Sequence, residues 1–276
     1  MIDPVKTLVT HISPHLDDIA AVWLFKKFFP SFKNAKIKFI SQSQTDKVAD
    51  TETKDRIFFG IGKGRFDEHK GDLEDCATSL VWKEIKKEGL APKDSFEIKA
   101  YDEMVQWNFL VDTAKLPPGE FDNYRLDSFI RSYENSPEDS LRTVKLGCEI
   151  LDRIMPKLIK KQRGLDEWEK RIEFKSRWGK SVAVEGADFS RNLAYSKGFM
   201  VVAQLSPVDH FIGITASGLS KIDLTPIYAA LIKKEPDIPW FLHHAKKMVL
   251  CGSASAPDAK RSKLNLKEVI EIVKSV

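Results

Sequence analysis

The sequence predicts an α/β protein with two domains. In the first half of the chain, segments rich in β-forming residues alternate with helical segments, a pattern typical of a largely parallel sheet. A second β-rich portion begins near residue 181 and indicates a smaller α+β domain. At roughly 100–200 residues per domain, the length of 276 residues fits this division. We expect a domain over 1–175, including a helical linker, and a C-terminal substrate-binding domain over 176–276.

The chain opens with strand, turn and helix. Residues 7–12 alternate and are β-rich, the Ser-Pro pair after them breaks the strand, and an apolar run with helical spacing covers residues 19–25. Two further strands are expected before a helix that Gly89 ends. These later elements are predicted at 36–41, 56–61 and 76–88.

The middle of the chain, residues 126–177, is helical by pattern, with interruptions at Pro137 and Pro156. It is expected to form a helical cap or linker. The elements expected beyond it are strands at 181–184, 199–205, 210–214 and 247–252, and helices at 225–234 and 266–274.

Composition excludes some classes of protein and leaves others open. Charged residues make up 30% and the net charge is +4, which permits an anionic substrate without identifying one. The three cysteines are far apart, so neither a disulfide framework nor a cysteine metal site is indicated. No stretch approaches the ~18 apolar residues of a membrane span, and the N-terminus lacks a signal pattern. We expect a cytoplasmic protein without a membrane anchor.

Histidine is scarce, yet two of the six histidines, His11 and His15, follow the first strand and precede Asp17 and Asp18. Ligand sites collect at such strand ends. Imidazole with carboxylate suits manganese best here, with zinc, iron or cobalt as alternatives. Asp18 is the better placed of the two aspartates to cap the following helix. The competing interpretation is that either aspartate simply caps the helix and that the histidines are ordinary turn residues.

A second acidic cluster, Asp67-Glu68-His69, lies just beyond the third expected strand and would reach the same edge of a parallel sheet. Gly60 and Gly62 precede it. Glycines there permit a phosphate to approach the backbone closely, although they also serve as turn formers. The two clusters together favour a divalent-metal site.

These motifs resemble those of the DHH phosphoesterase superfamily, and within it the MYG-type exonuclease-like proteins. The resemblance is clearest over residues 5–110 and weaker to the end of the chain. It implies a DHH-like N-terminal domain in which Asp67-Glu68-His69 matches the name-giving Asp-His-His. The metal ligands it implies are His11, His15, Asp17, Asp67, Glu68 and Asp102, with His69 and Asp67 in catalysis.

Two positions depart from the family pattern. Glu68 stands where the tripeptide has its middle histidine, and a carboxylate there still suits a divalent ion. Gly60 stands where the family's bridging aspartate usually lies. Because a glycine cannot bridge two cations, we expect about one tightly bound ion instead of the pair of a two-metal site.

The C-terminal domain offers residues for an anionic substrate. Arginine binds phosphate through its planar fork, tandem histidines can place one ring toward a cleft, and a Gly-Ser loop can present amides and hydroxyls. Structural roles for the histidines and an ordinary turn for the loop are the competing interpretations. The substrate-binding candidates are Arg191, His243, His244, Gly252, Ser253 and Ser255.

The sequence as a whole therefore predicts a divalent-metal-dependent phosphoesterase, a hydrolase acting on a phosphodiester. Exonuclease action on short RNA or DNA is the finer expectation. The expected partners are a phosphorylated small molecule or a short nucleic acid, with no membrane, and a homo-oligomer is allowed. The alternative is a catalytically degenerate metal- or nucleotide-binding protein, and a scaffold without metal is a third hypothesis.

Overall fold

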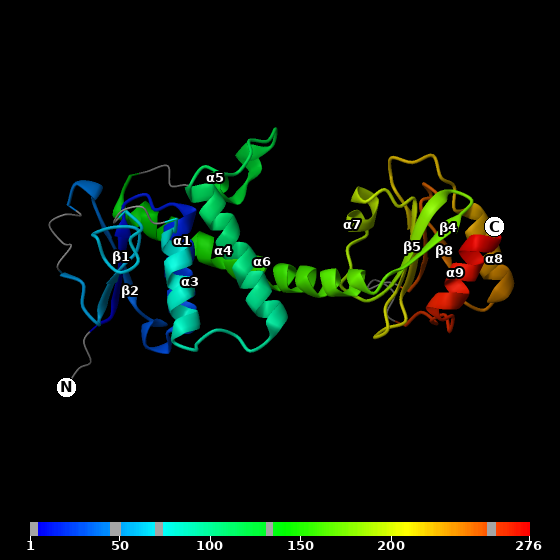
Figure 1. The fold of residues 1–276 in the computed structure, drawn as a ribbon, viewed down its shortest axis with the longest axis horizontal. Coiled ribbons are helices and arrows are strands. Elements are labelled where there is room, and N and C mark those ends of the chain that lie inside the picture. Colours follow the sequence, from blue (N-terminus) through cyan, green and yellow to red (C-terminus); the bar gives the residue numbers. More distant parts are fainter. Residues whose placement is uncertain (1–4, 45–50, 70–73, 131–134, 253–257) are drawn as a thin grey trace. The chain divides into compact units, whose positions relative to one another are not determined.

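The computed structural model describes residues 5–44, 51–69, 74–130, 135–252 and 258–276. Contacts within the chain divide it into two compact units, residues 1–159 and 160–276. The division falls inside one long helix, α6 (Pro137–Glu169), and therefore earlier than the boundary at 175 expected from sequence. Figure 1 shows the elements of both units along the chain.

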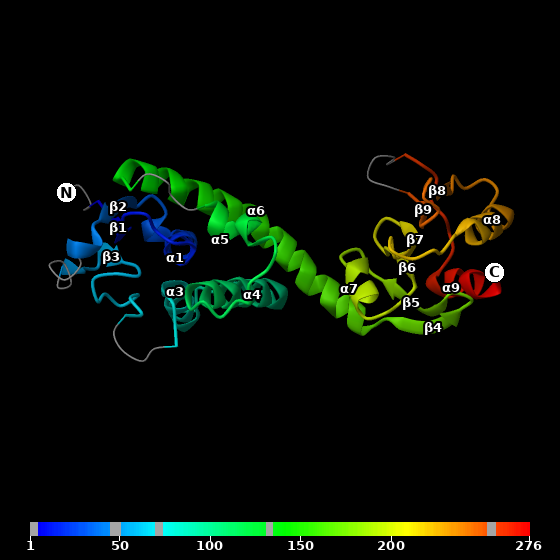
Figure 2. The ribbon, with the colours of Figure 1, turned by 90° about the horizontal axis from the view of Figure 1, so that it is seen from above.

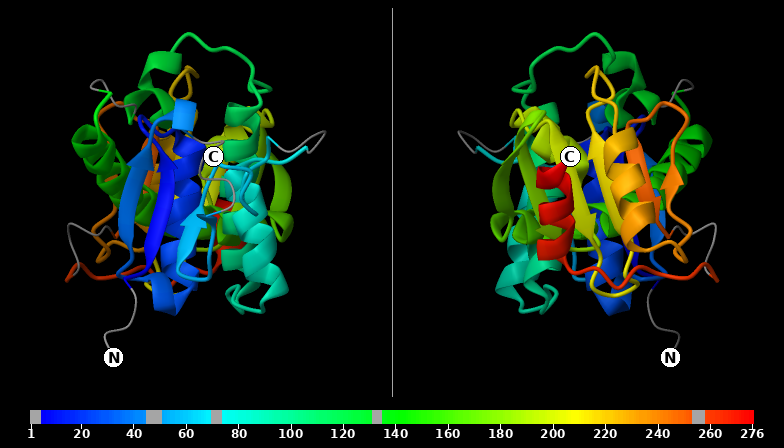
Figure 3. Two further views of the ribbon diagram at one scale, coloured as in Figure 1. Left: turned by 90° about the vertical axis from the view of Figure 1, so that its left-hand side faces the viewer. Right: turned by 90° about the vertical axis from the view of Figure 1, so that its right-hand side faces the viewer.

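Unit 1 is built on a three-stranded parallel sheet, as the sequence predicted. The strand order is β2-β1-β3, so the strand with the first histidine is central (Figure 3). The strands are β1 (Thr7–His11), β2 (Lys36–Ile40) and β3 (Arg56–Phe58). The helices are α1 (Leu16–Phe28), α3 (Ala77–Lys87), α4 (Ser95–Asp112), α5 (Leu126–Phe129) and the first part of α6; single 3-10 turns cover Pro30–Phe32, Gln42–Gln44 and Asp122–Tyr124.

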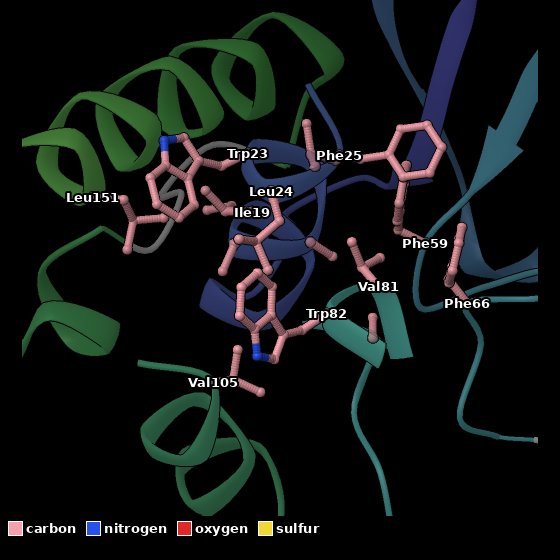
Figure 4. Close-up of a cluster of buried hydrophobic side chains, with 14 of the residues drawn as sticks. Ile19, Trp23, Leu24, Phe25, Phe59, Phe66, Val81, Trp82, Val105 and Leu151 are labelled. Atoms are coloured by element: carbon pink, nitrogen blue, oxygen red, sulfur yellow. The ribbon is translucent and has the colours of Figure 1, made fainter. Parts of the chain in front are cut away.

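Helix α1 is the centre of the unit 1 core. Every residue from Leu16 to Phe25 is buried, because the helix packs against the sheet through Phe59 and against α3 through Trp82 (Figure 4). A helix that is covered all round needs apolar residues all round. Two aspartates nevertheless lie in its buried first turn, at positions 17 and 18.

Between residues 95 and 176, three elements differ from the sequence prediction. Helix α4 was not predicted. Helix α6 continues through Pro156, although proline removes one helical hydrogen bond; the buried side chains of Leu151 and Met155 anchor this stretch of the helix in the core. Residues at the end of the expected helical stretch form a strand instead, β4 (Ile172–Ser176), which pairs with β5.

Unit 2 is a six-stranded mixed sheet with the order β4-β5-β6-β7-β9-β8. Alternate residues of the central strands face opposite sides. Helices α8 and α9 cover the core on one face, and α7 and the end of α6 cover the other (Figures 2 and 3). The remaining strands are β5 (Gly179–Glu185), β6 (Val201–Leu205), β7 (Ile212–Ala216), β8 (Phe241–Leu242) and β9 (Met248–Cys251), and the helices are α7 (Arg191–Ser196), α8 (Thr225–Lys234) and α9 (Leu266–Ser275).

Candidate metal centre

The tight turn between β1 and α1 sets the position of the first cluster. Ser13 adopts φ +57°, a left-handed conformation that is uncommon outside glycine, and its amide donates to Ser140 Oγ at 2.9 Å. His15 is the N-cap of α1, and its backbone amide donates to Asp18 Oδ2 at 3.0 Å. The sequence-based expectation that Asp18 serves the cap is therefore met, and the same carboxylate also faces His11.

His11 lies at the carboxyl end of β1, only 9% exposed, and both of its ring nitrogens are engaged. Nδ1 lies 2.7 Å from the carbonyl oxygen of Ile12, and Nε2 lies 2.9 Å from Asp18 Oδ2. Burial alone would lower the pKa of His11, but the hydrogen bond and the charge of Asp18 outweigh it and raise the pKa to about 9. A proton is thus held between an imidazole nitrogen and a carboxylate oxygen. A cation shared by the two groups would take the same place.

Asp17 has a structural role as well as a place in the cluster. Its two carboxylate oxygens accept from the backbone amides of Ala77 and Thr78, at 2.8 and 3.0 Å, and so satisfy the start of α3. Burial, followed by the neighbouring charge of Asp18, raises the pKa of Asp17 to about 6. This carboxylate joins α1 to α3 and also adds negative charge to the interior.

The segment after β3 brings the second cluster to the same edge of the sheet. Asp67 is buried, and its carboxylate accepts from the amides of Lys63 and His69, at 2.7 and 3.0 Å. His69 Nδ1 lies 2.9 Å from the same carboxylate, while the ring itself is exposed. Burial opposes protonation of His69, yet the hydrogen bond to Asp67 raises its pKa above the ordinary value. Asp67 therefore shapes this loop and orients the His69 ring.

Glu68 is the least satisfied carboxylate of the cluster. Its Oε2 is buried without a hydrogen-bond partner in the described part of the chain, and Oε1 lies 3.5 Å from His69 Nδ1. Burial, with the nearby charges of Asp17 and Asp18, raises the pKa of Glu68 to about 8. A buried carboxylate oxygen without a donor is costly unless a proton or a cation neutralises it. The buried Glu68 Oε2 is therefore the atom whose surroundings best fit a bound metal ion.

Helix α4 supplies an acid that sequence reasoning missed. Asp112, at the end of the helix, lies with Asp17 and Glu68, and its pKa is raised by desolvation and by Asp18. One turn earlier, Asn108 is 1% exposed and its Oδ1 has no partner among the described residues. The two lie four residues apart, so they share one face of a helix. The four-residue spacing of Asn108 and Asp112 was the signal that the sequence offered. It indicates a shared helix face only after the segment has been recognised as a helix.

The structure places Asp102 away from these groups. Its carboxylate accepts from Trp82 Nε1 at 2.6 Å and from Lys86 Nζ at 3.2 Å, and its side chain is half exposed. Asp102 lies ten residues before Asp112 on α4, a rise of about 15 Å along the helix axis, and there it contacts α3. The acid that α4 brings to the site is Asp112, and Asp102 is corrected to a surface contact.

Among the described residues, the candidate ligand atoms fall into three groups, each with its atoms within 4.8 Å of one another. Glu68 belongs to two of them, and the charges of His15 and His69 both act on Asp112, which links all three groups electrostatically. A small cavity of about 150 Å³ adjoins them, lined by His15, Leu16, Asp17, Asn108, Val111, Asp112 and Asp127. Imidazole and carboxylate donors in this arrangement suit a divalent transition metal.

Gly60 lies against the same cluster. Its φ is +62°, and a Cβ at this position would lie 2.2 Å from Asp18 Oδ1. The Asp18 carboxylate therefore fills the space that any side chain at position 60 would need. Glycine is required here both by the backbone conformation and by this close approach.

In unit 2 the substrate-binding candidates lie in different places. His243 and His244 lie in the turn between β8 and β9, with ring centroids 4.1 Å apart and ring planes tilted by 39°. Gly252 has φ +87° and lies against the Arg261 guanidinium. Arg191 begins α7 and lines a separate pocket. Ser253 and Ser255 lie outside the described residues.

Comparison with known proteins gives structural likeness only. No family model matches the chain, and no curated relative matches it. Solved structures similar to it include the pGpG-specific phosphodiesterase of Vibrio cholerae, with 13% identity, a TM-score of 0.35, and coverage of 97% of this chain and 98% of that one. A second is the DHH domain of a member of a family of ribosomal proteins, with 11% identity, a TM-score of 0.33, and coverage of 98% of this chain and 86% of that one.

A third similar structure is RecJ of Thermus thermophilus in complex with Mn²⁺, with 11% identity, a TM-score of 0.30, and coverage of 98% of this chain and 52% of that one. The chain resembles DHH-domain proteins. No helix in the described part of the chain combines the length and apolar composition that crossing a bilayer requires.

Proposed function

We propose that the chain is a divalent-metal-dependent phosphoesterase that cleaves a phosphodiester. The observation that carries the proposal is the buried Oε2 of Glu68, which has no hydrogen-bond partner among the described residues and lies within a cluster of carboxylates and imidazoles. Without a cation, burial and then the charges of neighbouring carboxylates raise the pKa values of Asp17, Glu68 and Asp112. Manganese is the metal expected first, with zinc, iron or cobalt as alternatives.

The residues around the cluster have distinct tasks in this proposal. His11 donates Nδ1–H to a carbonyl, which leaves Nε2 as its ligand atom, and His15, Asp17, Asp18, Glu68 and Asp112 complete the donor set. A divalent cation bound here would lower the pKa of a water molecule toward neutral and offset the charge that develops on phosphate oxygens.

His69 is the residue proposed to act on the substrate. Asp67 holds its Nδ1, so Nε2–H is the atom that donates to a phosphate oxygen or to the leaving oxygen. The raised pKa of His69 favours the protonated ring that this task requires. Asp67 serves as the positioning residue through the hydrogen bond that orients the ring.

The rival function is a metal- or nucleotide-binding protein without catalysis. Gly60 favours it, because residue 60, at the family's bridging position, has no carboxylate of its own. The neighbouring Asp18 side chain occupies the space that a side chain at position 60 would need. About one tightly bound ion is expected, since two cations held close without a bridging anion repel strongly. Exonuclease action on short RNA or DNA is the finer form of the phosphoesterase proposal.

Metal content and hydrolysis test the two functions together. The protein is loaded with Mn²⁺, its metal content is measured by mass spectrometry, and hydrolysis of bis-p-nitrophenyl phosphate and of a short end-labelled RNA is followed. His15→Ala and Glu68→Gln should each weaken metal binding at least about 10–100-fold and abolish hydrolysis. Asp102→Asn is the matched control, because that side chain is half exposed and bonded to Trp82 and Lys86.

Each outcome has a defined meaning. Bound metal with hydrolysis in the wild type and in Asp102→Asn supports the enzyme. Bound metal without hydrolysis of either substrate supports the rival. Purified protein that takes up no divalent ion contradicts both functions and supports the third hypothesis, a scaffold without metal.

A further inference from the structure

Unit 2 contains a polar pocket that is separate from the metal centre and from the turn with the paired histidines. Its volume is about 370 Å³, within the roughly 300–1,000 Å³ of small-molecule sites. The lining comes from α6 at Lys160, from the start of α7 and the loop before it, and from the end of β6 and the loop that follows it. Lys160, Ser190, Arg191, Gln204, Ser206, Asp209 and Phe211 are among its residues.

Arg191 is the central cation of this pocket. Its side chain is partly buried, and burial lowers its pKa. Within the described residues it forms no ion pair with a carboxylate. The charge is therefore partly desolvated without a counterion, which is unfavourable unless an anion binds.

The surrounding residues hold the guanidinium in one orientation. Buried Gln204 donates its Nε2–H to the carbonyl of Gly186 at 3.0 Å, and its Oε1 accepts from Arg191 Nε at 3.3 Å. Gly213 lies next to the Arg191 guanidinium. A Cβ at this position would lie 3.1 Å from Arg191 Nη2, so a larger residue would crowd the guanidinium. A glycine inside a strand often marks a close approach of this kind. The Nε–H is thus used inside the protein, and the two terminal nitrogens remain for a ligand, apart from one long contact to Met248 Sδ at 3.8 Å.

The other charged groups of the pocket are already paired. Lys160 lies 3.7 Å from Asp188. The Asp209 carboxylate accepts from the amide of Phe211 at 3.2 Å, and its hydrogen bond with Ser206 lowers its pKa. It remains ionised, and so it can accept from a hydroxyl group of a ligand. Phe211 offers an aromatic surface beside Arg191. The guanidinium carbon of Arg191 lies 5.8 Å from the centroid of the Phe211 ring.

We propose that this pocket binds the phosphate group of a mononucleotide, with Arg191 as the phosphate fork and Gln204 as its positioning residue. Arginine presents paired donors that match phosphate geometry. The hydroxyl of Ser190 adds a further donor. The volume, the aromatic ring and the Asp209 acceptor suit a ligand larger than inorganic phosphate.

Calorimetric titration of the full chain in EDTA tests the site without any contribution from a bound metal. AMP and inorganic phosphate are the two probes, and AMP is expected to bind more tightly. Arg191→Gln should weaken AMP binding about 10–100-fold, as expected for lost charge-assisted hydrogen bonds. Arg191→Lys keeps the charge without the fork and should recover only part of the loss. Lys160→Gln, which removes a paired cation of the same pocket, is the matched control and should change binding less than threefold.

Absence of AMP binding to the wild type, or equal affinity in wild type and in both Arg191 variants, would overturn the proposal. Phosphate binding as tight as AMP binding would refute the mononucleotide and reduce the ligand to an inorganic anion. Circular dichroism of each variant establishes that the fold is intact. Since the titration contains no divalent metal, its failure leaves the proposed phosphoesterase untouched, and the reverse also holds.

Discussion

Unit 1 and unit 2 bury unneutralised groups of opposite sign, and they hold them differently. In unit 1 the acids gather at the carboxyl ends of parallel strands, and Glu68 Oε2 is left without a donor among the described residues. In unit 2 the Arg191 guanidinium lies over a mixed sheet, with no carboxylate partner among the described residues. Both arrangements cost folding free energy, because a buried charge needs a partner.

The difference indicates what each site binds. A cluster of acids raises the pKa of its own members, so protons compete with a metal ion for the same oxygens. An isolated arginine does not lose its proton near neutral pH, so only an anion can neutralise it. Ligand binding at the metal centre should therefore depend on pH, and binding at the arginine pocket should not depend on a protein proton.

The largest expected effect separates the two neighbouring aspartates of the metal centre. Asp17→Asn and Asp18→Asn should each lower Mn²⁺ affinity at least about tenfold while leaving AMP binding in EDTA unchanged. Only Asp17→Asn should also destabilise the metal-free protein, by about 1–3 kcal/mol, because an amide cannot accept from both Ala77 and Thr78. Urea unfolding and metal titration measure both quantities. Equal stability of the two variants would show that the cap on α3 contributes little.

A smaller effect concerns the glycine beside Asp18. Gly60 and Gly62 both have positive φ, so alanine at either position should cost about 1–2 kcal/mol through the backbone alone. Only at Gly60 would the new Cβ meet the Asp18 carboxylate; at Gly62 its nearest neighbour is the Phe58 ring at 3.5 Å. Gly60→Ala should therefore cost more stability and also weaken metal binding, whereas Gly62→Ala should leave the metal affinity unchanged. Matched unfolding and metal titrations of the two variants check this.

The same geometry bears on Gly60→Asp. Sequence alone suggests that an aspartate there restores a metal bridge if the backbone does not require positive φ. That condition is not met, because φ at Gly60 is +62° and the Asp18 carboxylate occupies the space for a side chain. Gly60→Asp is therefore not expected to restore a bridge. A variant with two tightly bound ions and normal stability would contradict this expectation.

Sequence patterns were informative where the signal is local. The strand, turn and helix around His11 and His15 follow from alternation, a Ser-Pro break and an apolar run, and all lie within 22 residues, from Thr7 to Phe28. Asp112 could not be found in this way. It reaches the cluster through the packing of α4, more than 90 residues after the first strand, and α4 itself has weak amphipathic periodicity because apolar residues occur on several of its faces. The double role of Asp18 likewise depends on a three-dimensional approach to His11 that its spacing does not encode.

The smallest expected effect is the pH dependence of stability in the metal-free protein. The pKa values of Asp17 and Glu68, about 6 and about 8, exceed those of free carboxyl groups, so the folded state binds these protons more tightly than the unfolded state. Stability therefore falls as pH rises from the ordinary carboxyl range through these values. His11 acts in the same direction, because the stability from its bound proton is complete below 6.5 and is lost as pH rises through about 9.

Calorimetry in EDTA should accordingly find the melting temperature decreasing from pH 5 to pH 9, by a few degrees. Saturating Mn²⁺ should reverse the trend, because the cation replaces the protons and its stabilising effect increases with pH. Glu68→Gln should flatten both curves, since it removes the group with the highest carboxyl pKa. Stabilisation by AMP in EDTA should instead change little between pH 7.5 and pH 9, where the Arg191 charge is constant. A melting temperature that rises with pH in EDTA would mean that the acids of unit 1 are neutralised by a group other than a proton or a metal ion.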